Sequence, residues 1–289
     1  MGSLSQPKFL VLTLYSGENE FDACQKSVAD QLHVDVEQVA FKGLGNLEAH
    51  RRLYSEIMAR APEFDLFLKL DADMVLSRNT ALYEIAEFFA ARPELDHLET
   101  EVNDHFTGAK IFGVHVFSPR VTWQIDTHDP LFVDPEPTCP GSRARSPSEL
   151  DIFVEHAPDP GPYQAFHFGF HRALKAFQFN VEHRSLSRME AQLAILQDLE
   201  RHYETTKRAS LGLSIIAADM VMNGRLNGET GDKSDTSVET AFEKVSQLTP
   251  SEVHKQVRQG RSTRKFTIWK ERTKCRLKLW KHGFVRRFK

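Results

Sequence analysis

Strand-like and helix-like segments alternate along the first part of the chain, and this alternation constrains the fold more than any other feature. Residues 8–15 (KFLVLTLY) are continuously apolar and β-prone, as is typical of a strand buried on both faces of a parallel sheet. Further strand patterns follow at residues 36–41 and 64–70. Two amphipathic helices are predicted between them, marked by Phe21, Cys24, Val28 and Leu32 and by Ala49, Leu53 and Ile57. This order predicts an α/β fold with a doubly wound, mostly parallel sheet.

Asp71 and Asp73 directly follow the third predicted strand. Ligands of doubly wound sheets bind at the carboxyl ends of the strands, where these two side chains would lie. Two carboxylates separated by one residue suit a hard divalent cation, and such a cation would hold a diphosphate and stabilise its charge as a leaving group. The alternative is structural, because a D-x-D tripeptide also caps loops and helices, here the predicted helix at residues 80–91. The apolar strand before the pair favours a metal site.

Three segments of the chain resemble bacterial family 2 glycosyltransferases and their GT-A relatives. The segment LDADMVL, residues 70–76, is similar to the metal motif of the family and is the most specific match. Residues 46–54 resemble its second helix, and residues 9–15 with Asn19, Glu20, Cys24, Ser27 and Gln31 resemble its opening strand and helix. The resemblance extends to about residue 120. It implies a GT-A fold (Rossmann-like, with a mostly parallel central sheet), a nucleotide-diphosphate-sugar donor and Mn²⁺ or Mg²⁺.

The sequence also departs from the pattern of this family. Phe41-Lys42-Gly43 stands where the family usually has an acid that contacts the nucleoside. The Q-x-x-R-W signature of processive polysaccharide synthases is missing, which favours addition of a single sugar. The Glu-Asp pair that often supplies the catalytic base in the family is missing as well, so the base must come from another segment.

Several polar residues near the predicted strand ends are candidate contacts of the nucleotide-sugar donor. Thr13 and Tyr15 end the first strand and could flank the base, Tyr15 by stacking. Lys69 precedes the acidic pair, where a cation beside a diphosphate is favourable. Arginines of the second helix could reach phosphate, although a solvated helix face explains them equally well. The candidate donor contacts are therefore Thr13, Tyr15, Asn46, Arg51, Lys69 and Asp71, with Arg52 as a neighbour of Arg51.

A histidine from a later segment is expected to complete the metal shell, as the resemblance implies. His156 ends the apolar run at residues 150–157, which predicts another strand, and we choose it as the third ligand beside Asp71 and Asp73. His167 and His171 are alternatives on one face of a helix predicted at residues 164–177. That helical pair lacks the Glu of H-E-x-x-H, which disfavours a zinc hydrolase. A structural role or a phosphate contact remains open for each histidine.

An inverting transferase needs a general base on the acceptor side. Glu155 and Asp151 are the candidate catalytic carboxylates, because they lie in the predicted strand at residues 150–157, which follows a proline-rich stretch at residues 130–147 suited to acceptor loops. Positions four apart in a regular strand face the same way, so both could serve one site. Both could equally be surface acids, and a retaining mechanism would need no base.

The end of the chain is strongly basic, with 14 Lys and Arg against the single acid Glu271 in residues 255–289. Lys and Arg also surround an apolar helical face in this tail, formed by Phe266, Trp269, Leu277, Trp280, Phe284 and Phe288. A basic helix of this kind suits the surface of an anionic membrane. An RNA-binding tail and a tail that docks on the acidic remainder of the chain are the alternatives. Residues 1–180 are predicted as the catalytic domain, 181–254 as a helical extension and linker, and 255–289 as the tail.

Cellular context and function class follow from the remaining patterns. Three widely separated cysteines, Cys24, Cys139 and Cys275, and no recognisable secretory signal predict a cytoplasmic protein, with peripheral contact at the inner face of the membrane. Helical stripes between residues 189 and 220 predict packing on the sheet or a homodimer. We expect a single-addition glycosyltransferase acting on a glycan or lipid-linked glycan. The rival functions are a nucleotidyltransferase and a non-catalytic protein that binds polyanions.

Overall fold

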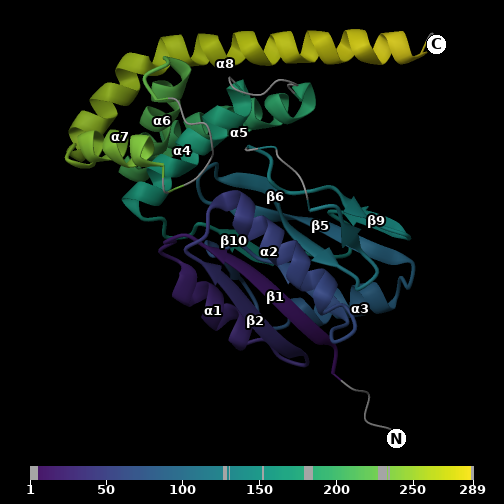
Figure 1. Cartoon of the computed structure of the whole chain (residues 1–289). Coiled ribbons are helices and arrows are strands. Elements are labelled where there is room, and N and C mark those ends of the chain that lie inside the picture. The colour runs from purple at the N-terminus through teal and green to yellow at the C-terminus, as the bar shows by residue number, and fades with distance from the viewer. Residues whose placement is uncertain are drawn as a thin grey trace, which may run out of the picture. The chain divides into compact units, whose positions relative to one another are not determined.

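The computed structural model describes residues 6–125, 129, 131–151, 153–178, 185–226, 233 and 235–287, with side chains to residue 281. The chain forms two compact units. Unit 1 comprises Met1–His105, Ala109–His128 and Val133–Pro160, and unit 2 comprises Phe106–Gly108, Asp129–Phe132 and Gly161–Lys289. Unit 1 holds the strands and unit 2 the long helices (Figure 1).

Unit 1 is built on one eight-stranded sheet whose strand order is β2-β1-β3-β6-β5-β10-β4, with β9 paired to β5. Strands β6 and β4 run against the other six, because β6 pairs antiparallel with β3 and β5, and β4 pairs antiparallel with β10. The sheet is therefore mostly parallel, as the sequence predicts. Its strands are β1 (Lys8–Tyr15), β2 (Asp35–Lys42), β3 (Leu66–Lys69), β4 (Met74–Leu76), β5 (Leu95–Asp104), β6 (Ala109–Phe117), β9 (Ser142–Arg145) and β10 (Val154–His156). A separate pair joins β7 (Thr122–Trp123) to β8 (Pro137–Thr138).

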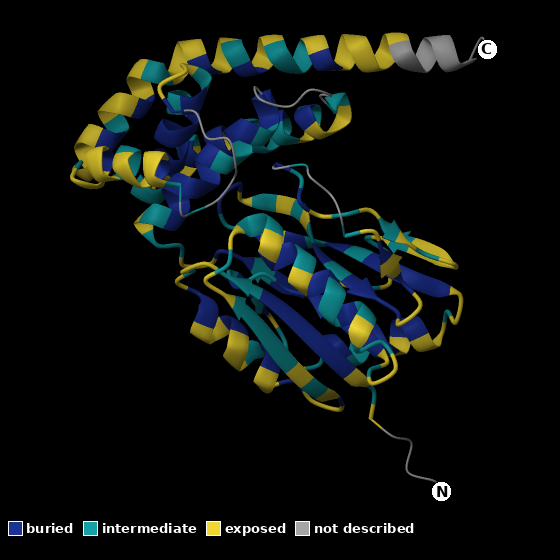
Figure 2. Ribbon diagram, in the orientation of Figure 1, coloured by how far each residue is buried: buried dark blue, intermediate teal, exposed yellow. Residues whose placement is uncertain are grey.

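Helices cover both faces of this sheet. Phe9 and Val11 of β1 pack with α1 (Phe21–Ala29) and α3 (Ala81–Ala90) in one apolar core. Leu10 and Leu12 point the other way and pack with α2 (Asn46–Ala59) in a second core. Successive side chains of a strand alternate between faces, which is why a strand covered on both sides must be apolar throughout. Figure 2 shows the buried strands beneath half-exposed helices.

Unit 2 consists of α4 (Pro162–Phe177), α5 (Leu186–Thr206), α6 (Ala209–Met222), α7 (Thr236–Ser246) and α8 (Pro250–Arg287). Helices α4 and α6 pack closely at Gly169. A Cβ atom at this position would lie 1.7 Å from the carbonyl oxygen of Ser214. The sequence placed the helix of residues 164–177 in a first domain that ends at residue 180, whereas this packing divides the units at Gly161. The predicted stripes on α5 and α6, such as Leu193 and Ile216, are buried within unit 2.

The basic end of the chain is part of unit 2. Arg264 of α8 has a side chain only 2% exposed and pairs with Glu200 of α5 and Asp219 of α6. Burial of a guanidinium requires such partners, so this contact fixes α8 on the two helices. Within the described residues, no helix has the length and apolar character needed to cross a bilayer.

Candidate active site at the end of strand β3

The turn that holds Asp71 and Asp73 joins β3 to β4 and is fixed by backbone hydrogen bonds on two sides. Ala72, fully buried between the two acids, donates its N–H to the carbonyl oxygen of Leu14 at 3.1 Å, which continues the parallel pairing of β1 and β3. Ala157, just after β10, donates its N–H to the carbonyl oxygen of Asp73 at 2.7 Å. The turn therefore lies between the carboxyl end of β1 and the end of β10.

Asp71 carries a buried carboxylate oxygen for which the described residues provide no hydrogen-bond donor, namely Oδ1. Burial raises the pKa of Asp71; Lys69 acts in the opposite direction, while Asp73 raises it further. A buried oxygen without a donor is costly to the folded protein, and a bound cation would satisfy it. The residues at this turn therefore fit a cation.

His156 lies between two carboxylates because β10 pairs with β4 on one side and β5 on the other. Its Nδ1 is 2.6 Å from Asp104 Oδ1, and its Nε2 is 3.5 Å from Asp73 Oδ2. Burial by itself would lower the pKa of His156, but Asp73 and Asp104 raise it to about 10. The ring is thus a charged donor to both acids. The following residue, Ala157, has the left-handed backbone φ of 50°, which is unusual for a residue with a side chain.

Asp104 is the residue of this group that sequence reasoning missed. It ends β5, its side chain is fully buried, and it lies 52 residues before its partner His156. The strand LDHLETEVND carries four acids among its ten residues, so its apolar pattern is weak. The local signal that could have found Asp104 is its position at a strand end, since buried carboxylates need a partner.

A second polar network joins the buried Lys69 to Asp134, whose side chain is half exposed. Asp134 accepts hydrogen bonds from Lys69 Nζ at 2.7 Å and from Tyr54 Oη at 2.6 Å, and His50 Nε2 is 3.4 Å away. Burial alone would raise the pKa of Asp134, but Lys69 and His50 hold it well below its usual range. Lys69, expected at the donor phosphates, is therefore paired with a carboxylate in this structure. No sequence motif pointed to Asp134, because its partner Tyr54 lies 80 residues away.

The predicted donor contacts on β1 line the carboxyl end of the sheet. Thr13 is fully buried and its Oγ1 accepts a hydrogen bond from Gln38 Nε2 at 2.8 Å. The Tyr15 ring lies 4.3 Å from the Phe21 ring, and Lys42 Nζ lies 5.4 Å from the Tyr15 ring centre. Lys42 thus lies over aromatic rings at the end of β2, at the position where the glycosyltransferases that the sequence resembles usually have an acid.

The predicted contacts on α2 occupy its first two turns. Asn46 is the first residue of α2, and its carbonyl oxygen is 2.8 Å from His50 Nδ1. Arg51 is half-buried on the same helix. Arg52 pairs with Glu48 at 2.7 Å on the exposed side, as expected for a solvated helix face.

The two candidate bases do not share the surroundings of Asp73. Glu155 points to the opposite face of β10 from His156, because successive strand residues alternate. It accepts hydrogen bonds from Asn103 Nδ2 at 2.8 Å and from His105 Nε2 at 3.1 Å. Asp151 is exposed. Their catalytic role stays a prediction.

Motif residues of the first helix connect the loops around the site. Asn19 donates to the carbonyl oxygen of Asp159 at 2.7 Å, and Glu20 accepts a hydrogen bond from the N–H of Asp159 at 3.1 Å. Ser27 Oγ accepts from the N–H of Leu76 in β4 at 3.1 Å. These contacts tie the loops after β1 and β10 together and hold β4, so the motif residues stabilise the surroundings of Asp71 and Asp73.

Among the residues that the structure describes, no group of three or more His, Cys, Asp or Glu side chains is arranged so that it could hold a metal ion. The alternative histidines, His167 and His171, belong to α4 in unit 2, with ring centres 5.7 Å apart. Burial lowers the pKa of His171 well below its ordinary value. His167 is buried and lies beside the rings of Tyr163 and Phe170, which fits a structural role.

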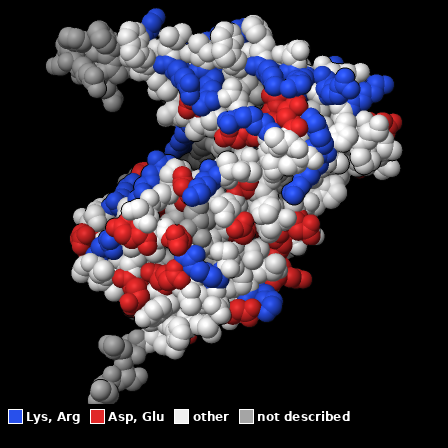
Figure 3. Space-filling view, turned by 180° about the vertical axis from the view of Figure 1, so that it is seen from behind, with Lys and Arg blue, Asp and Glu red and all other residues white. Residues whose placement is uncertain are grey.

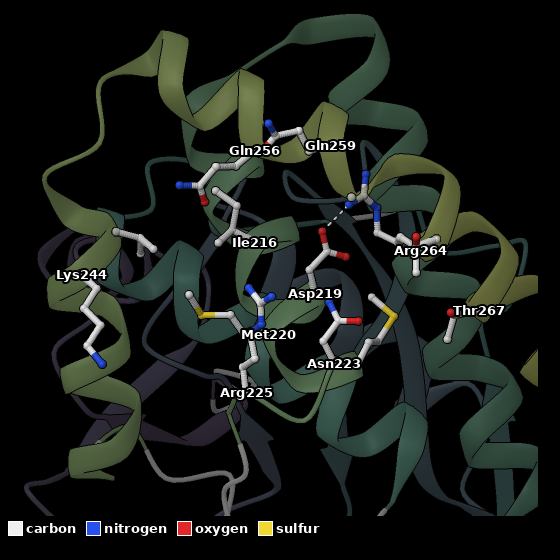
Figure 4. A pocket seen from close by; sticks show the side chains of 14 residues that line it. Ile216, Asp219, Met220, Asn223, Arg225, Lys244, Gln256, Gln259, Arg264 and Thr267 are labelled. Carbon is white, nitrogen blue, oxygen red and sulfur yellow. Dashed lines mark hydrogen bonds and ion pairs between the residues drawn. The ribbon is translucent and has the colours of Figure 1, made fainter.

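A cavity of about 780 Å³ lies between α6, α7 and α8 of unit 2 (Figure 4). The ion pair of Asp219 and Arg264 forms part of its wall. Burial raises the pKa of Asp219 to about 6, although Arg264 lowers it. This cavity contains none of the site residues predicted from the sequence.

No family model and no curated protein matches the chain. A solved glycosyltransferase involved in the glycosylation of the major capsid of PBCV-1 is 11% identical, with 54% of this chain and 95% of that chain covered and a TM-score of 0.35. The mannosyltransferase PcManGT from Pyrobaculum calidifontis, solved in complex with GDP-Man and Mn²⁺, is also 11% identical, with 92% and 86% covered and a TM-score of 0.37. Both are glycosyltransferases, the class of protein that the sequence resembles.

Proposed function

We propose that the chain is a glycosyltransferase that moves one sugar from a nucleotide-diphosphate-sugar donor to a glycan or lipid-linked glycan. The observation that carries this proposal is the buried Oδ1 of Asp71, which has no hydrogen-bond donor among the described residues and lies one residue from Asp73. Such an oxygen is suited to bind a cation, and a strand end in an α/β sheet is where a diphosphate would be held.

Asp71, Asp73 and His156 are the proposed ligands of Mn²⁺ or Mg²⁺. When bound, such a cation supplies a Lewis acid that stabilises the diphosphate leaving group. An open set of protein ligands suits this role, because Mg²⁺-type sites take one or two carboxylates and fill the remaining positions with water and substrate phosphates. His156 would bind through Nε2 after the cation displaces the proton that this nitrogen holds toward Asp73, and Asp104 would fix the ring through Nδ1, as carboxylates do for metal-bound histidines.

Lys69 and the aromatic corner of β1 are the proposed donor contacts. Lys69 Nζ would turn from Asp134 toward the diphosphate, which also carries negative charge. Tyr15 offers a ring face for the nucleobase at the end of β1, beside Thr13, Asn46 and Arg51. Glu155 or Asp151 would accept the proton of the acceptor hydroxyl if the transfer inverts the anomeric configuration.

The acceptor would meet the site at a membrane, and we place the enzyme at the cytoplasmic, inner face of an anionic bilayer. Residues 255–289 would make this peripheral contact, because a lipid-linked glycan is presented at such a surface. A homodimer is also proposed as the working form, and size-exclusion chromatography with light scattering measures it directly.

A nucleotidyltransferase is disfavoured by the loop after β1. Such an enzyme would cradle a triphosphate with backbone N–H groups or cations. Here the donors of Ser16 are already used by the carboxylate of Glu18. The Ser16 N–H donates to Glu18 at 2.6 Å, and the Ser16 Oγ donates to it at 2.7 Å. A carboxylate at this position repels a polyphosphate.

The proposal is tested by screening nucleotide sugars for donor hydrolysis and thermal stabilisation, with and without Mn²⁺. Asp71→Asn and Asp73→Asn each remove one negative charge with little change in shape, and each should lower Mn²⁺-dependent turnover at least about a hundredfold. Asp30→Asn, at an exposed acid of unit 1, is the matched control and should keep full activity. Absence of any metal-dependent response across the panel, or full activity of both site variants, would contradict the proposal.

A further inference from the structure

Helix α8 has two sides with different surroundings. Val253, Val257, Ile268 and Cys275 are buried on the side that packs in unit 2. Basic residues of that side are paired within the unit, as Arg272 and Arg276 both contact Glu190 at 2.8 and 2.9 Å. Acids of unit 2 thus neutralise basic residues on this side of the helix. The other side of α8 faces solvent.

The other side of α8 is apolar. Phe266, Trp269, Leu277 and Trp280 are 60%, 59%, 55% and 65% exposed. With Thr273 they follow three- and four-residue spacing, so they form one stripe along the helix. Five of the seven large hydrophobic side chains exposed in the described part of the chain belong to α8, so this exposure is concentrated on one helix. Phe284 and Phe288, also predicted for this face, lie outside the residues with described side chains.

Exposed lysines accompany the stripe. Lys270, Lys274, Lys278 and Lys281 follow one edge at three- and four-residue intervals. Figure 3 shows Lys and Arg gathered along α8. Lys side chains can rest their alkyl stems on apolar surface while the ammonium group reaches outward, so cations here would lie at the level of lipid phosphates if the stripe entered a bilayer.

We infer that this face of α8, formed by Phe266, Trp269, Leu277 and Trp280 and the lysines beside it, binds the surface of an anionic lipid bilayer. The helix lies in the plane of the membrane, with the stripe among the acyl chains and the lysines at the headgroups. Charge complementarity selects anionic over neutral lipid. A continuous apolar stripe selects a bilayer over RNA, whose single strands bind proteins in positively charged grooves that pair stacking with phosphate contacts.

The inference is independent of sugar transfer, so vesicle binding tests it by itself. The full chain is mixed with phosphatidylcholine vesicles that either contain or lack phosphatidylglycerol, and binding is followed by co-sedimentation. Anionic vesicles should bind at least about tenfold more tightly, because each lysine near the surface adds attraction. The double variant W269S/W280S should weaken that binding roughly a hundredfold, because two large apolar side chains no longer enter the bilayer.

Tryptophan fluorescence gives a second readout with an internal reference. The chain has three tryptophans, and Trp123 is only 6% exposed in the core of unit 1. Brominated acyl chains should quench the emission of Trp269 and Trp280 and leave that of Trp123. The control variant L32S/F112S removes two exposed hydrophobic side chains of unit 1 and should bind vesicles like the natural chain.

Three results would overturn the inference: equal binding to both kinds of vesicle, unchanged binding by W269S/W280S, or emission that brominated lipid does not quench. Binding of single-stranded RNA that W269S/W280S abolishes, in a chain that ignores vesicles, would assign the face to nucleic acid instead. Concentration-dependent dimerisation lost in the same variant, again without vesicle binding, would assign it to a second copy of the chain.

Discussion

Replacement of Asp71 by Asn should stabilise the metal-free protein, because the natural residue holds a charged oxygen in a buried place without a hydrogen-bond donor among the described residues. A buried polar group without a partner costs about 1–3 kcal/mol, and more when it is charged. Asn has nearly the same shape but no charge. Part of the gain is offset, since the attraction between Asp71 and Lys69 is lost, while Lys69 keeps Asp134 as its partner.

The net gain expected for Asp71→Asn is about 1–2 kcal/mol in the free energy of unfolding, or roughly 2–8 °C in Tm for a unit of this size. Urea and thermal unfolding in the presence of a chelator measure it. Mn²⁺ should then raise the Tm of the natural chain and leave that of the variant unchanged, since only the natural chain binds the ion. A site residue that costs stability is typical of a functional role.

The result that refutes this reasoning is a loss of stability in Asp71→Asn without metal. If Asp71 merely caps the turn or the following helix, the carboxylate contributes to the fold, and its replacement should lower the free energy of unfolding by about 0.5–2 kcal/mol. The sign of the change therefore separates the metal-site interpretation from the structural one that the D-x-D tripeptide left open.

Three further variants or conditions test other parts of the structure. Asp104→Asn should lower Mn²⁺ affinity about 10- to 100-fold in a thermal-shift titration, because His156 loses the carboxylate that orients it, and unchanged affinity would exclude this positioning role. His97 and His115 share a hydrogen bond of 3.0 Å, and burial lowers their pKa values to about 4 and about 3. The unfolded chain therefore binds more protons than the folded one below pH 6.5, so the free energy of unfolding should fall as pH falls from 6.5 toward 4. The loss should reach up to about 2 kcal/mol per histidine at pH 5. A free energy of unfolding in urea that does not change over this pH range would contradict the prediction. Gly169→Ala should destabilise unit 2 by at least about 2 kcal/mol in urea unfolding, because the new methyl group meets the carbonyl oxygen of Ser214. An unaltered urea midpoint would show that α4 and α6 are not so closely packed.

Much of unit 1 could be predicted because its signals are local. The run at residues 8–15 has the continuous apolar character of a doubly covered strand, and β1 occupies the same residues. Phe21, Cys24 and Val28 are buried on α1 as their spacing predicts, but Leu32 follows the end of the helix and is 46% exposed. The predicted strands at 64–70 and 150–157 shorten to Leu66–Lys69 and Val154–His156. Strand ends depend on the pairing partner, which a single segment does not reveal.

The candidate site was predictable only in part. The strand end with Asp71 and Asp73 follows from local pattern, and His156 was chosen as a residue at another strand end. Asp104 and Asp134 escaped notice because their partners lie far away in sequence, at 52 residues for His156 and 65 for Lys69. Such pairs form only when the fold brings residues together that are distant in sequence, and no periodicity in the chain encodes them.

The sequence by itself determined the acidic pair, the alternation of strands and helices, and the basic aromatic end of the chain, because each depends on residues within one or two turns or one strand of each other. Only the tertiary structure decided the surroundings of the pair. It paired Lys69 with Asp134, placed His156 between Asp73 and Asp104, and left Asp71 Oδ1 without a donor among the described residues. The physical reason is that β10 pairs with β4 and β5, which brings His156 next to Asp73 and Asp104, while the fold brings a distant loop with Asp134 to Lys69.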